Sequence, residues 1–185
     1  PERTREEVRK FVGNGAGELI RRAAPEGADD EALSALGEAF RARYYAHCAD
    51  KTRPYDGIPG LLSAMRAAGM KTAVVSNKPD KAVAKLAEDY FPHAFDIAVG
   101  ERDGVRRKPA PDAVLEVMKR LGATAEETVY IGDSDVDCAT AANAGTDFIG
   151  VCWGFRPREV LEESGAKVVC AAADELFALI LGSER

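Results

Sequence analysis

The sequence has few of the residues that build metal-thiolate sites or disulfide frameworks. It contains four cysteines and two histidines in 185 residues. No cysteine stands in a CxxC or Cys/His ligand spacing, so we predict free, buried thiols in a reducing cytoplasm. His47 and His93 lie far from the other candidate site residues, and we assign both to the surface or to partly buried positions.

Long apolar runs and excess positive charge are also missing. No stretch approaches the ~18 continuous apolar residues of a membrane span, and the N-terminal PERTREEVRKF is too charged for a signal peptide. The net charge of −6 gives no general attraction to nucleic acid or to anionic membranes. We therefore expect a cytoplasmic protein whose partner is a small molecule or another protein.

The hydrophobic pattern divides the chain into two regions. From Glu2 to about Asp50, apolar residues recur at helical spacing and no strand candidate appears. The following stretch, KTRPYDGIPG, holds two prolines and two glycines and is the best hinge candidate. We therefore predict a helical unit over residues 1–52 and a second unit over residues 53–185.

In the second region, short β-rich runs alternate with amphipathic helical patterns. This alternation predicts βαβ crossovers and a parallel sheet covered on both faces, which is a Rossmann-like α/β fold. In such sheets ligands bind beyond the carboxyl ends of the strands, so the residues that end each strand are the candidates for a binding site. The predicted strands are Lys71–Ser76, Phe95–Gly100, Thr128–Gly132, Thr146–Cys152 and Ala166–Val169.

Two of the loops at strand ends carry groups that suit a phosphate. Ser76 and Asn77 end the first strand, where a hydroxyl and the following backbone N–H groups can donate hydrogen bonds to a phosphoryl oxygen. Capping of the next helix explains these two residues at least as well. Lys108, in RRKPAPD, precedes a helix and could aim its ammonium inward. A solvated basic turn is the simpler reading of that loop taken alone.

A third loop, GDSDVD, packs three carboxylates into five residues. Asp133 ends a strand and Asp137 follows four residues later, so these two share a helix face, whereas Asp135 points elsewhere, toward solvent. Two oxygen ligands at one strand end suit Mg²⁺. Attraction of acids to a helix N-terminus explains one carboxylate better than three. Together with Ser76 and Lys108, this loop predicts a Mg²⁺-assisted phosphoryl-transfer site.

Three motifs, VVSNK, KPAPD and GDSDVD, occur in an order and spacing that resemble the second, third and fourth motifs of the haloacid dehalogenase-like hydrolases. The closest subgroup is the phosphoglycolate phosphatase type, and the likeness covers essentially the whole chain. The stretch FVGNGAGELIRRA, which begins at Phe11, is similar to the substrate-facing part of that subgroup's helical cap. The resemblance therefore implies an N-terminal helical cap on a Rossmann-like core.

The resemblance also assigns roles to individual residues. In that family an aspartate attacks the phosphate ester, and water then hydrolyses the aspartyl-phosphate. Ser76 and Asn77 would bind phosphoryl oxygens, Lys108 would neutralise charge on nucleophile and phosphate, and Asp133 and Asp137 would hold Mg²⁺.

The cap stretch adds Gly13, Asn14 and Gly15 as candidate substrate-binding residues. Glycines let a backbone approach a small substrate closely. Glycines that merely connect two helices explain the same stretch nearly as well.

The family's first motif, DxDGT, occurs nowhere in the 185 residues. That motif carries the nucleophile and the acid/base, on a strand that lies between the strands ending at Ser76 and Gly132. Without that strand, its neighbours would stand about 10 Å apart instead of ~4.8 Å, with unpaired backbone groups on both edges. We expect a fragment of a longer protein; a swapped or rearranged sheet and a non-catalytic descendant are the alternatives.

The expected function is Mg²⁺-dependent hydrolysis of a small phosphate monoester, with phosphoglycolate as the first guess. Sugar phosphates, nucleotides and pyrophosphate compete within the same class of enzyme. A catalytically inactive module that binds phosphate and metal, or that has a regulatory role, is the alternative from another class. In either case we expect the 185 residues alone to be inactive.

Overall fold

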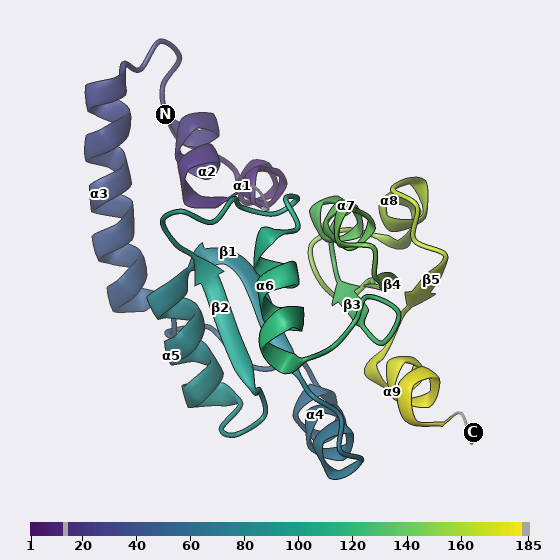
Figure 1. The fold of residues 1–185 in the computed structure, drawn as a ribbon. Helices are drawn as coiled ribbons and strands as arrows, with labels where there is room; N and C mark the ends of the chain where they lie inside the picture. Colours follow the sequence, from purple (N-terminus) through teal and green to yellow (C-terminus); the bar gives the residue numbers. More distant parts are fainter. Residues whose placement is uncertain (13–14, 183–185) are drawn as a thin grey trace.

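A computed structural model describes residues 1–12 and 15–182 (Figure 1). The helices are α1 (Arg5–Phe11), α2 (Gly15–Ala23), α3 (Asp30–His47), α4 (Ile58–Ala67), α5 (Asp80–Tyr90), α6 (Asp112–Leu121), α7 (Asp135–Ala144), α8 (Arg158–Glu163) and α9 (Ala173–Leu181). The strands are β1 (Ala73–Pro79), β2 (Ile97–Glu101), β3 (Val129–Gly132), β4 (Asp147–Val151) and β5 (Val168–Cys170).

The N-terminal region consists of the helices α1, α2 and α3, and the described residues before β1 contain no strand. Helix α1 begins at a capping box, in which Thr4 and Glu7 each accept a hydrogen bond from the other's backbone N–H. Helix α3 begins at Asp29, whose carboxylate accepts a hydrogen bond from Ala32 N at 2.8 Å. Local sequence signals therefore set where these helices start.

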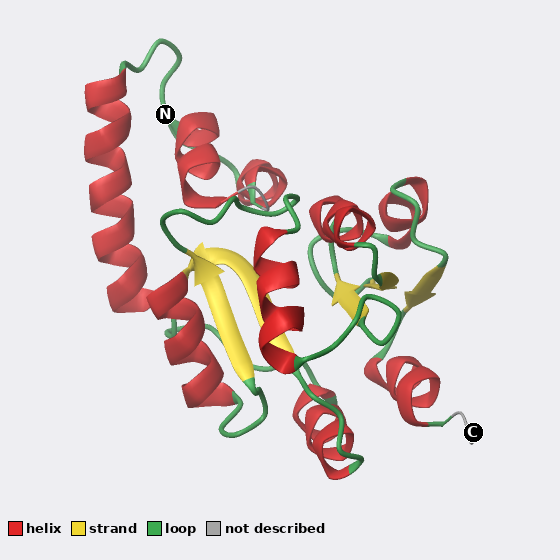
Figure 2. Cartoon of the chain, in the orientation of Figure 1, coloured by secondary structure: helices red, strands yellow, loops and turns green. Residues whose placement is uncertain are grey.

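Every paired strand runs parallel to its neighbour, which confirms the predicted α/β class. Strand β1 pairs with β2, so that Ala73 lies opposite Ile97. Strand β4 lies between β3 and β5. Figure 2 shows the strands in yellow with the helices arranged around them.

The strands form two sheets rather than one. One sheet has the order β1-β2 and the other β3-β4-β5, so within residues 1–12 and 15–182 no strand pairing joins β1 to β3. Each of these two strands consequently keeps one edge without a paired neighbour in the described chain. This agrees with the expectation that the strands carrying Ser76 and Gly132 are not adjacent in one hydrogen-bonded sheet.

Helix α6 connects the two sheets through apolar packing. Val117 packs with Ile97 and Val99 of β2. On the same helix, Val114 and Met118 pack in a second cluster with Ala144 of α7, and Val75 of β1 and Tyr130 of β3 lie against that cluster. The burial of α6 therefore holds β1 and β3 near each other without a shared ladder of hydrogen bonds.

The described residues also show the state of the cysteines and the character of the longest helices. All four cysteines are free, and three of them are buried. No helix in the described part of the chain is long and apolar enough to cross a membrane.

Gly100 determines how far β1 extends, which the sequence pattern placed too early, at Ser76. A Cβ on Gly100 would lie 2.4 Å from Lys78 O and 2.6 Å from Asp80 Cα. Gly100 N also donates a hydrogen bond of 2.7 Å to Asp80 Oδ1. This close approach of two backbones accompanies the extension of β1 to Pro79, one residue before α5 begins at Asp80.

We predict that Gly100→Ala lowers the free energy of unfolding by about 2 kcal/mol, because the added methyl meets backbone atoms that cannot move aside without displacing the end of β1. The matched control is Gly60→Ala in α4, where a Cβ meets nothing within 4 Å. That change should raise the free energy of unfolding by about 0.5 kcal/mol. Urea denaturation of both variants tests the pair, and equal midpoints would contradict the packing argument.

Candidate active site

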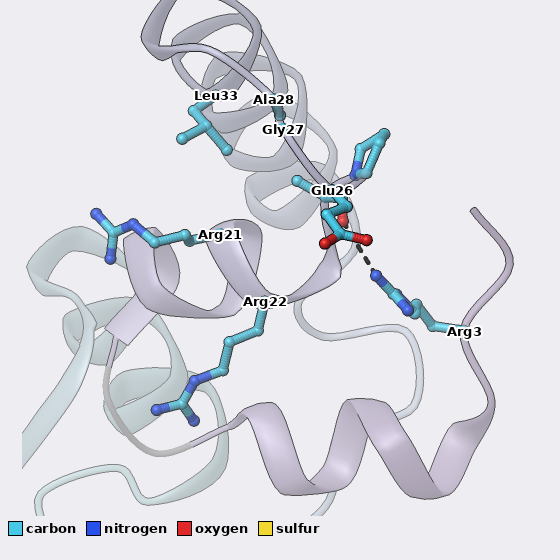
Figure 3. Close-up of a pocket in the computed structure, with 9 residues that line it drawn as sticks. Arg3, Arg21, Arg22, Glu26, Gly27, Ala28 and Leu33 are labelled. Carbon is cyan, nitrogen blue, oxygen red and sulfur yellow. Dashed lines mark hydrogen bonds between the residues drawn. The ribbon is translucent and has the colours of Figure 1, made fainter.

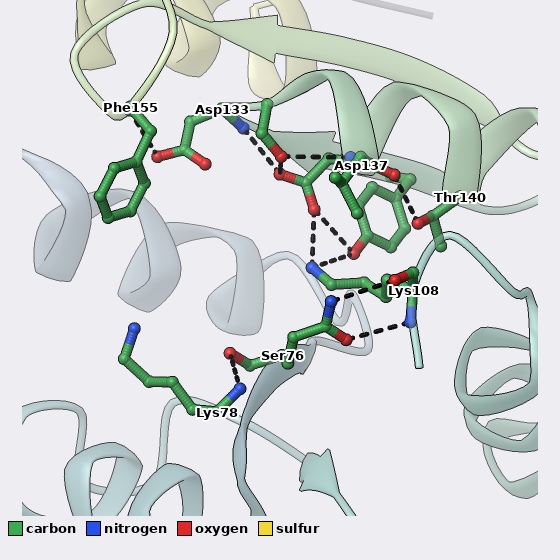
Figure 4. Close-up of polar contacts among 11 residues, drawn as sticks. Ser76, Lys78, Lys108, Asp133, Asp137, Thr140 and Phe155 are labelled. Carbon is green, nitrogen blue, oxygen red and sulfur yellow. Dashed lines mark hydrogen bonds and ion pairs between the residues drawn. The ribbon is translucent and has the colours of Figure 1, made fainter. Parts of the chain in front are cut away.

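The predicted site residues from three loops lie in one cluster, shown in Figure 4. Lys108 Nζ is 2.7 Å from Asp137 Oδ1. Asp133 N donates to Asp137 Oδ2 at 3.2 Å, and Ser76, in the middle of β1, lies beside this group. The structure thus brings together residues that are spread over about a third of the chain.

Asn77 fixes the loop that carries Lys108. Its amide donates to Lys108 O at 3.1 Å and accepts from Lys108 N at 3.0 Å. Helix α5 has Pro79 at its N-cap and no side-chain capping hydrogen bond. Helix capping is therefore the wrong explanation for Asn77, whose observed role is to hold a loop 31 residues away.

The ammonium of Lys108 points into the protein, with 12% of its side chain exposed. It bonds to Asp137 and donates to Tyr130 Oη at 3.1 Å. Burial acts against the charged form, but Tyr130 and Asp137 together raise the pKa of Lys108. The solvated basic turn describes Arg106, which pairs with Asp112 at the surface, and is wrong for Lys108.

Asp137 is surrounded by donors. Its Oδ1 accepts from Lys108 and from Tyr130 Oη, and its Oδ2 accepts from Ser134 Oγ at 2.6 Å and from Asp133 N. Burial acts to raise the pKa of Asp137, yet the Lys108 charge and these hydrogen bonds lower it. Asp137 is therefore a buried, ionised anchor for Lys108.

Asp133 has a different environment, although it stands only four residues away. Its Oδ2 accepts a hydrogen bond from Phe155 N at 3.0 Å, and it forms no ion pair within the described residues. Burial and the negative charge of Asp137 raise its pKa. A Cβ on Gly154 would lie 1.8 Å from Asp133 Oδ2, so only glycine fits there.

Whether a divalent cation fits at this site depends on the difference between the environments of Asp133 and Asp137. No group of three or more His, Cys, Asp or Glu side chains in the described chain is arranged to hold a metal. Asp133 nevertheless offers a hard oxygen ligand whose negative charge lacks compensation, which is what Mg²⁺ requires. Asp137 already accepts four hydrogen bonds, so its role as a second ligand stays a prediction.

Asp135 is partly exposed to solvent and has a partner of its own. Its Oδ1 forms an ion pair with Arg156 Nε at 2.8 Å, with 45% of the Asp135 side chain exposed.

Trp153 packs against the apolar cluster around Leu61 and belongs to the core.

The cap-side prediction is only partly described. Gly13 and Asn14 lie outside the described residues. Gly15 opens α2 with φ of +82°, and a Cβ there would lie 2.7 Å from Arg107 Nη1, beside the loop that carries Lys108. The N-terminal helices therefore contact the core close to the candidate site.

The contributions of Gly154 and Phe155, in the loop that follows β4, were not predicted from the sequence. Arg9 Nη2 donates to Gly154 O at 2.7 Å, and Arg156 Nη2 donates to Val12 O at 3.5 Å. This loop also supplies the Phe155 N–H that binds Asp133. Its position after a strand was the available signal, but it holds no carboxylate or hydroxyl to single it out.

A cavity of about 310 Å³ lies among the N-terminal helices and is lined by three arginines (Figure 3). Arg21 and Arg22 pair with Glu18 at 2.5 and 2.8 Å, and Arg3 donates to Ala24 O at 3.0 Å. The close-up shows the three side chains pointing in different directions. They do not converge on a common anion.

Comparisons with known proteins are consistent with this geometry. The family model described as haloacid dehalogenase-like hydrolase matches residues 1–151. The chain is 34% identical to a phosphoglycolate phosphatase of Pseudomonas syringae pv. syringae, over 96% of this chain and 66% of that protein. It is 31% identical to an N-acetylmuramic acid 6-phosphate phosphatase of Pseudomonas aeruginosa, over 92% and 76%.

A crystal structure assigned as a phosphoglycolate phosphatase from Lactobacillus delbrueckii subsp. bulgaricus superposes with a TM-score of 0.91 at 38% identity. The match covers 98% of this chain and 85% of that one. The chain spans 66% and 76% of the length of the two curated relatives named above.

The two aspartates should respond in opposite directions to neutralisation. Asp137→Asn removes the partner of a buried lysine and should lower the free energy of unfolding at pH 7 by about 3 kcal/mol. Asp133→Asn removes an uncompensated charge and should raise it, in the absence of metal. Urea denaturation from pH 7 down to pH 2 measures both differences.

The expected pH dependence follows from the two pKa shifts. The folded-state pKa of Asp137 is lowered, so its contribution to stability is present above its ordinary value of 3.8 and is lost as the pH falls through the folded pKa. The pKa of Asp133 is raised, so its cost at pH 7 disappears as the pH falls through that raised value. Two variants that shift stability in the same direction would contradict the assignment.

Proposed function

The chain belongs to the haloacid dehalogenase-like hydrolase family, and from this premise we propose that it forms the phosphate- and metal-binding part of a Mg²⁺-dependent phosphatase. Its substrate would be a small phosphate monoester. The observation that carries the proposal is the buried Lys108–Asp137 pair beside Ser76 and Asp133 at the strand ends. A cation, a hydroxyl and an uncompensated carboxylate are the groups that phosphoryl transfer needs.

Each residue has a role that its contacts support. Ser76 Oγ accepts a hydrogen bond from Lys78 N at 3.1 Å, which leaves its own proton available for a phosphoryl oxygen. Lys108, kept cationic by Asp137, stabilises negative charge on the phosphoryl group. Asp133 would hold Mg²⁺, which supplies further charge neutralisation when bound.

The nucleophile must come from outside these residues, because the 185 residues contain no DxDGT stretch. We propose that an aspartate on a preceding segment of a longer protein attacks phosphorus and displaces the alcohol of the ester, and that water then hydrolyses the aspartyl-phosphate, which releases inorganic phosphate and the free aspartate. The unpaired edges of β1 and β3 support this placement. A parallel strand between them would satisfy backbone groups on both sides and would end between Ser76 and Asp133.

Phosphoglycolate is the proposed substrate, because several relatives that span most of this chain carry that activity in their names. The relative named for N-acetylmuramic acid 6-phosphate keeps sugar phosphates as competitors. The four free thiols are consistent with a reducing compartment, and we place the reaction in the cytoplasm.

The alternative function is a binding module that holds phosphate and metal without turnover, and the missing DxDGT stretch is the observation that favours it. The genomic sequence upstream of Pro1 separates the two proposals. An in-frame DxDGT there supports the phosphatase, whereas a stop codon immediately before Pro1 supports the binding module.

The activity prediction concerns the 185 residues as given. They should hydrolyse phosphoglycolate and p-nitrophenyl phosphate at near-background rates, since losing a covalent nucleophile costs several orders of magnitude even when binding groups survive. Addition of an upstream segment that ends in DxDGT should restore Mg²⁺-dependent turnover. In that longer protein, Asp133→Asn should abolish turnover again, while Lys119→Gln on the exposed side of α6 serves as the control.

Steady-state release of inorganic phosphate, with and without Mg²⁺, measures these rates. Substantial turnover by the purified 185-residue chain, its mass confirmed, would show that the nucleophile has been misassigned.

A further inference from the structure

Lys78 and Ser76 are two residues apart on β1, and side chains alternate between the two faces of a strand. Asn77 turns to the other side and binds the loop of Lys108. Figure 4 shows the Lys78 ammonium and the Ser76 hydroxyl on the side that faces Asp133 and Phe155. Two residues of strand span about 6.6 Å, so the two groups can contact different ends of one small molecule.

The ammonium of Lys78 differs from the neighbouring cations because it forms no ion pair or hydrogen bond with any residue that the structure describes. Lys108 pairs with Asp137, Arg107 with Glu101, and Arg156 with Asp135. Those pairs leave Lys78 as an available cation beside the candidate phosphate-binding hydroxyl.

Lys78 lies where water reaches it although protein packs around it. The residue is exposed to solvent, yet desolvation by the surrounding protein lowers the pKa of its ammonium, Asp133 acts to raise it, and Lys108 lowers it further. A cation that water can reach, but that has lost part of its hydration, gains from an anionic ligand. The charge on Asp133 alone does not offset this loss.

We propose that Lys78 binds a second anionic group of the substrate while Ser76 and Lys108 bind its phosphoryl group. The substrate class is then a small phosphorylated acid, in which a carboxylate lies a few bonds from the phosphate. This inference rests on the proposed phosphatase function and adds the residue that would recognise the carboxylate of such a substrate. Lys78 is a specificity-determining residue, because it contacts the part of the substrate that does not react.

Binding of two matched ligands to the 185-residue chain tests the proposal without requiring turnover. 2-Phosphoglycolate and ethyl phosphate have similar size and share the phosphoryl group, but only the first carries a carboxylate. Isothermal titration calorimetry in the presence of Mg²⁺ gives the ratio of their dissociation constants. We expect phosphoglycolate to bind about tenfold tighter or more, the factor that a charge-assisted hydrogen bond supplies.

Lys78→Gln should reduce this ratio to about one, and Lys78→Arg should retain most of it, because the positive charge is kept. Lys119→Gln, which removes one exposed lysine from α6, should leave the ratio unchanged and controls for net charge. The arginine variant also keeps the test decisive if the glutamine variant fails to fold, since a ratio of one in folded Lys78→Arg would overturn the proposal.

The outcomes separate this inference from the proposed function. Two results would show that Lys78 does not bind the carboxylate while leaving the proposed phosphate site intact. In the first, both esters bind but the ratio of their dissociation constants is unchanged in Lys78→Gln. In the second, that ratio is already one in the unaltered chain. If neither ester binds the unaltered chain, the proposed function fails and the inference fails with it.

Discussion

The buried ion pair between Lys108 and Asp137 is the contact on which the arrangement of the site depends. The two sheets share no strand pairing in the described residues, so they are joined by the packing of α6 and by this pair. Removal of either partner would leave a buried charge without compensation, which costs far more than the intact pair contributes. Asn77 holds the lysine loop and Ser134 holds the aspartate, so both ends of the pair are fixed.

One positive charge between two carboxylates makes them chemically unequal. Lys108 bonds directly to Asp137 and lowers its pKa, whereas Asp133 has burial and a neighbouring negative charge that raise its pKa. Neighbouring groups whose pKa values are pushed apart are common at sites with divided roles. Here the division gives a permanent anchor and a carboxylate that gains from a cation. The ionised form of Asp133 therefore opposes stability in the metal-free protein, a cost that a functional site can retain.

Features that depend on the local sequence were predicted better than features that depend on contacts between segments far apart in the chain. Helical patterns in the sequence predict helices over Asp80–Tyr90, Asp135–Ala144 and Ala173–Leu181, and these are the limits of α5, α7 and α9. The end of β1 was missed because it depends on the close approach of Gly100 to another segment. The motif was enough to predict Lys108 as a site residue. Its hydrogen bonds with Asn77 could not be predicted, because they join loops that are 31 residues apart. Gly154 was not predicted as a site residue because it contributes by having no side chain, which leaves room for Asp133.

The loop after β4 gives the site a connection to the N-terminal helices. Gly154 O accepts a hydrogen bond from Arg9 of α1, and the next residue, Phe155, donates its N–H to Asp133. One peptide group therefore contacts the helical region through its carbonyl oxygen and the candidate metal ligand through its N–H. The absence of a side chain at Gly154 is what allows both contacts. Because the hydrogen bond from Phe155 N–H lowers the pKa of Asp133, any shift of α1 that moves this loop changes how readily Asp133 is ionised.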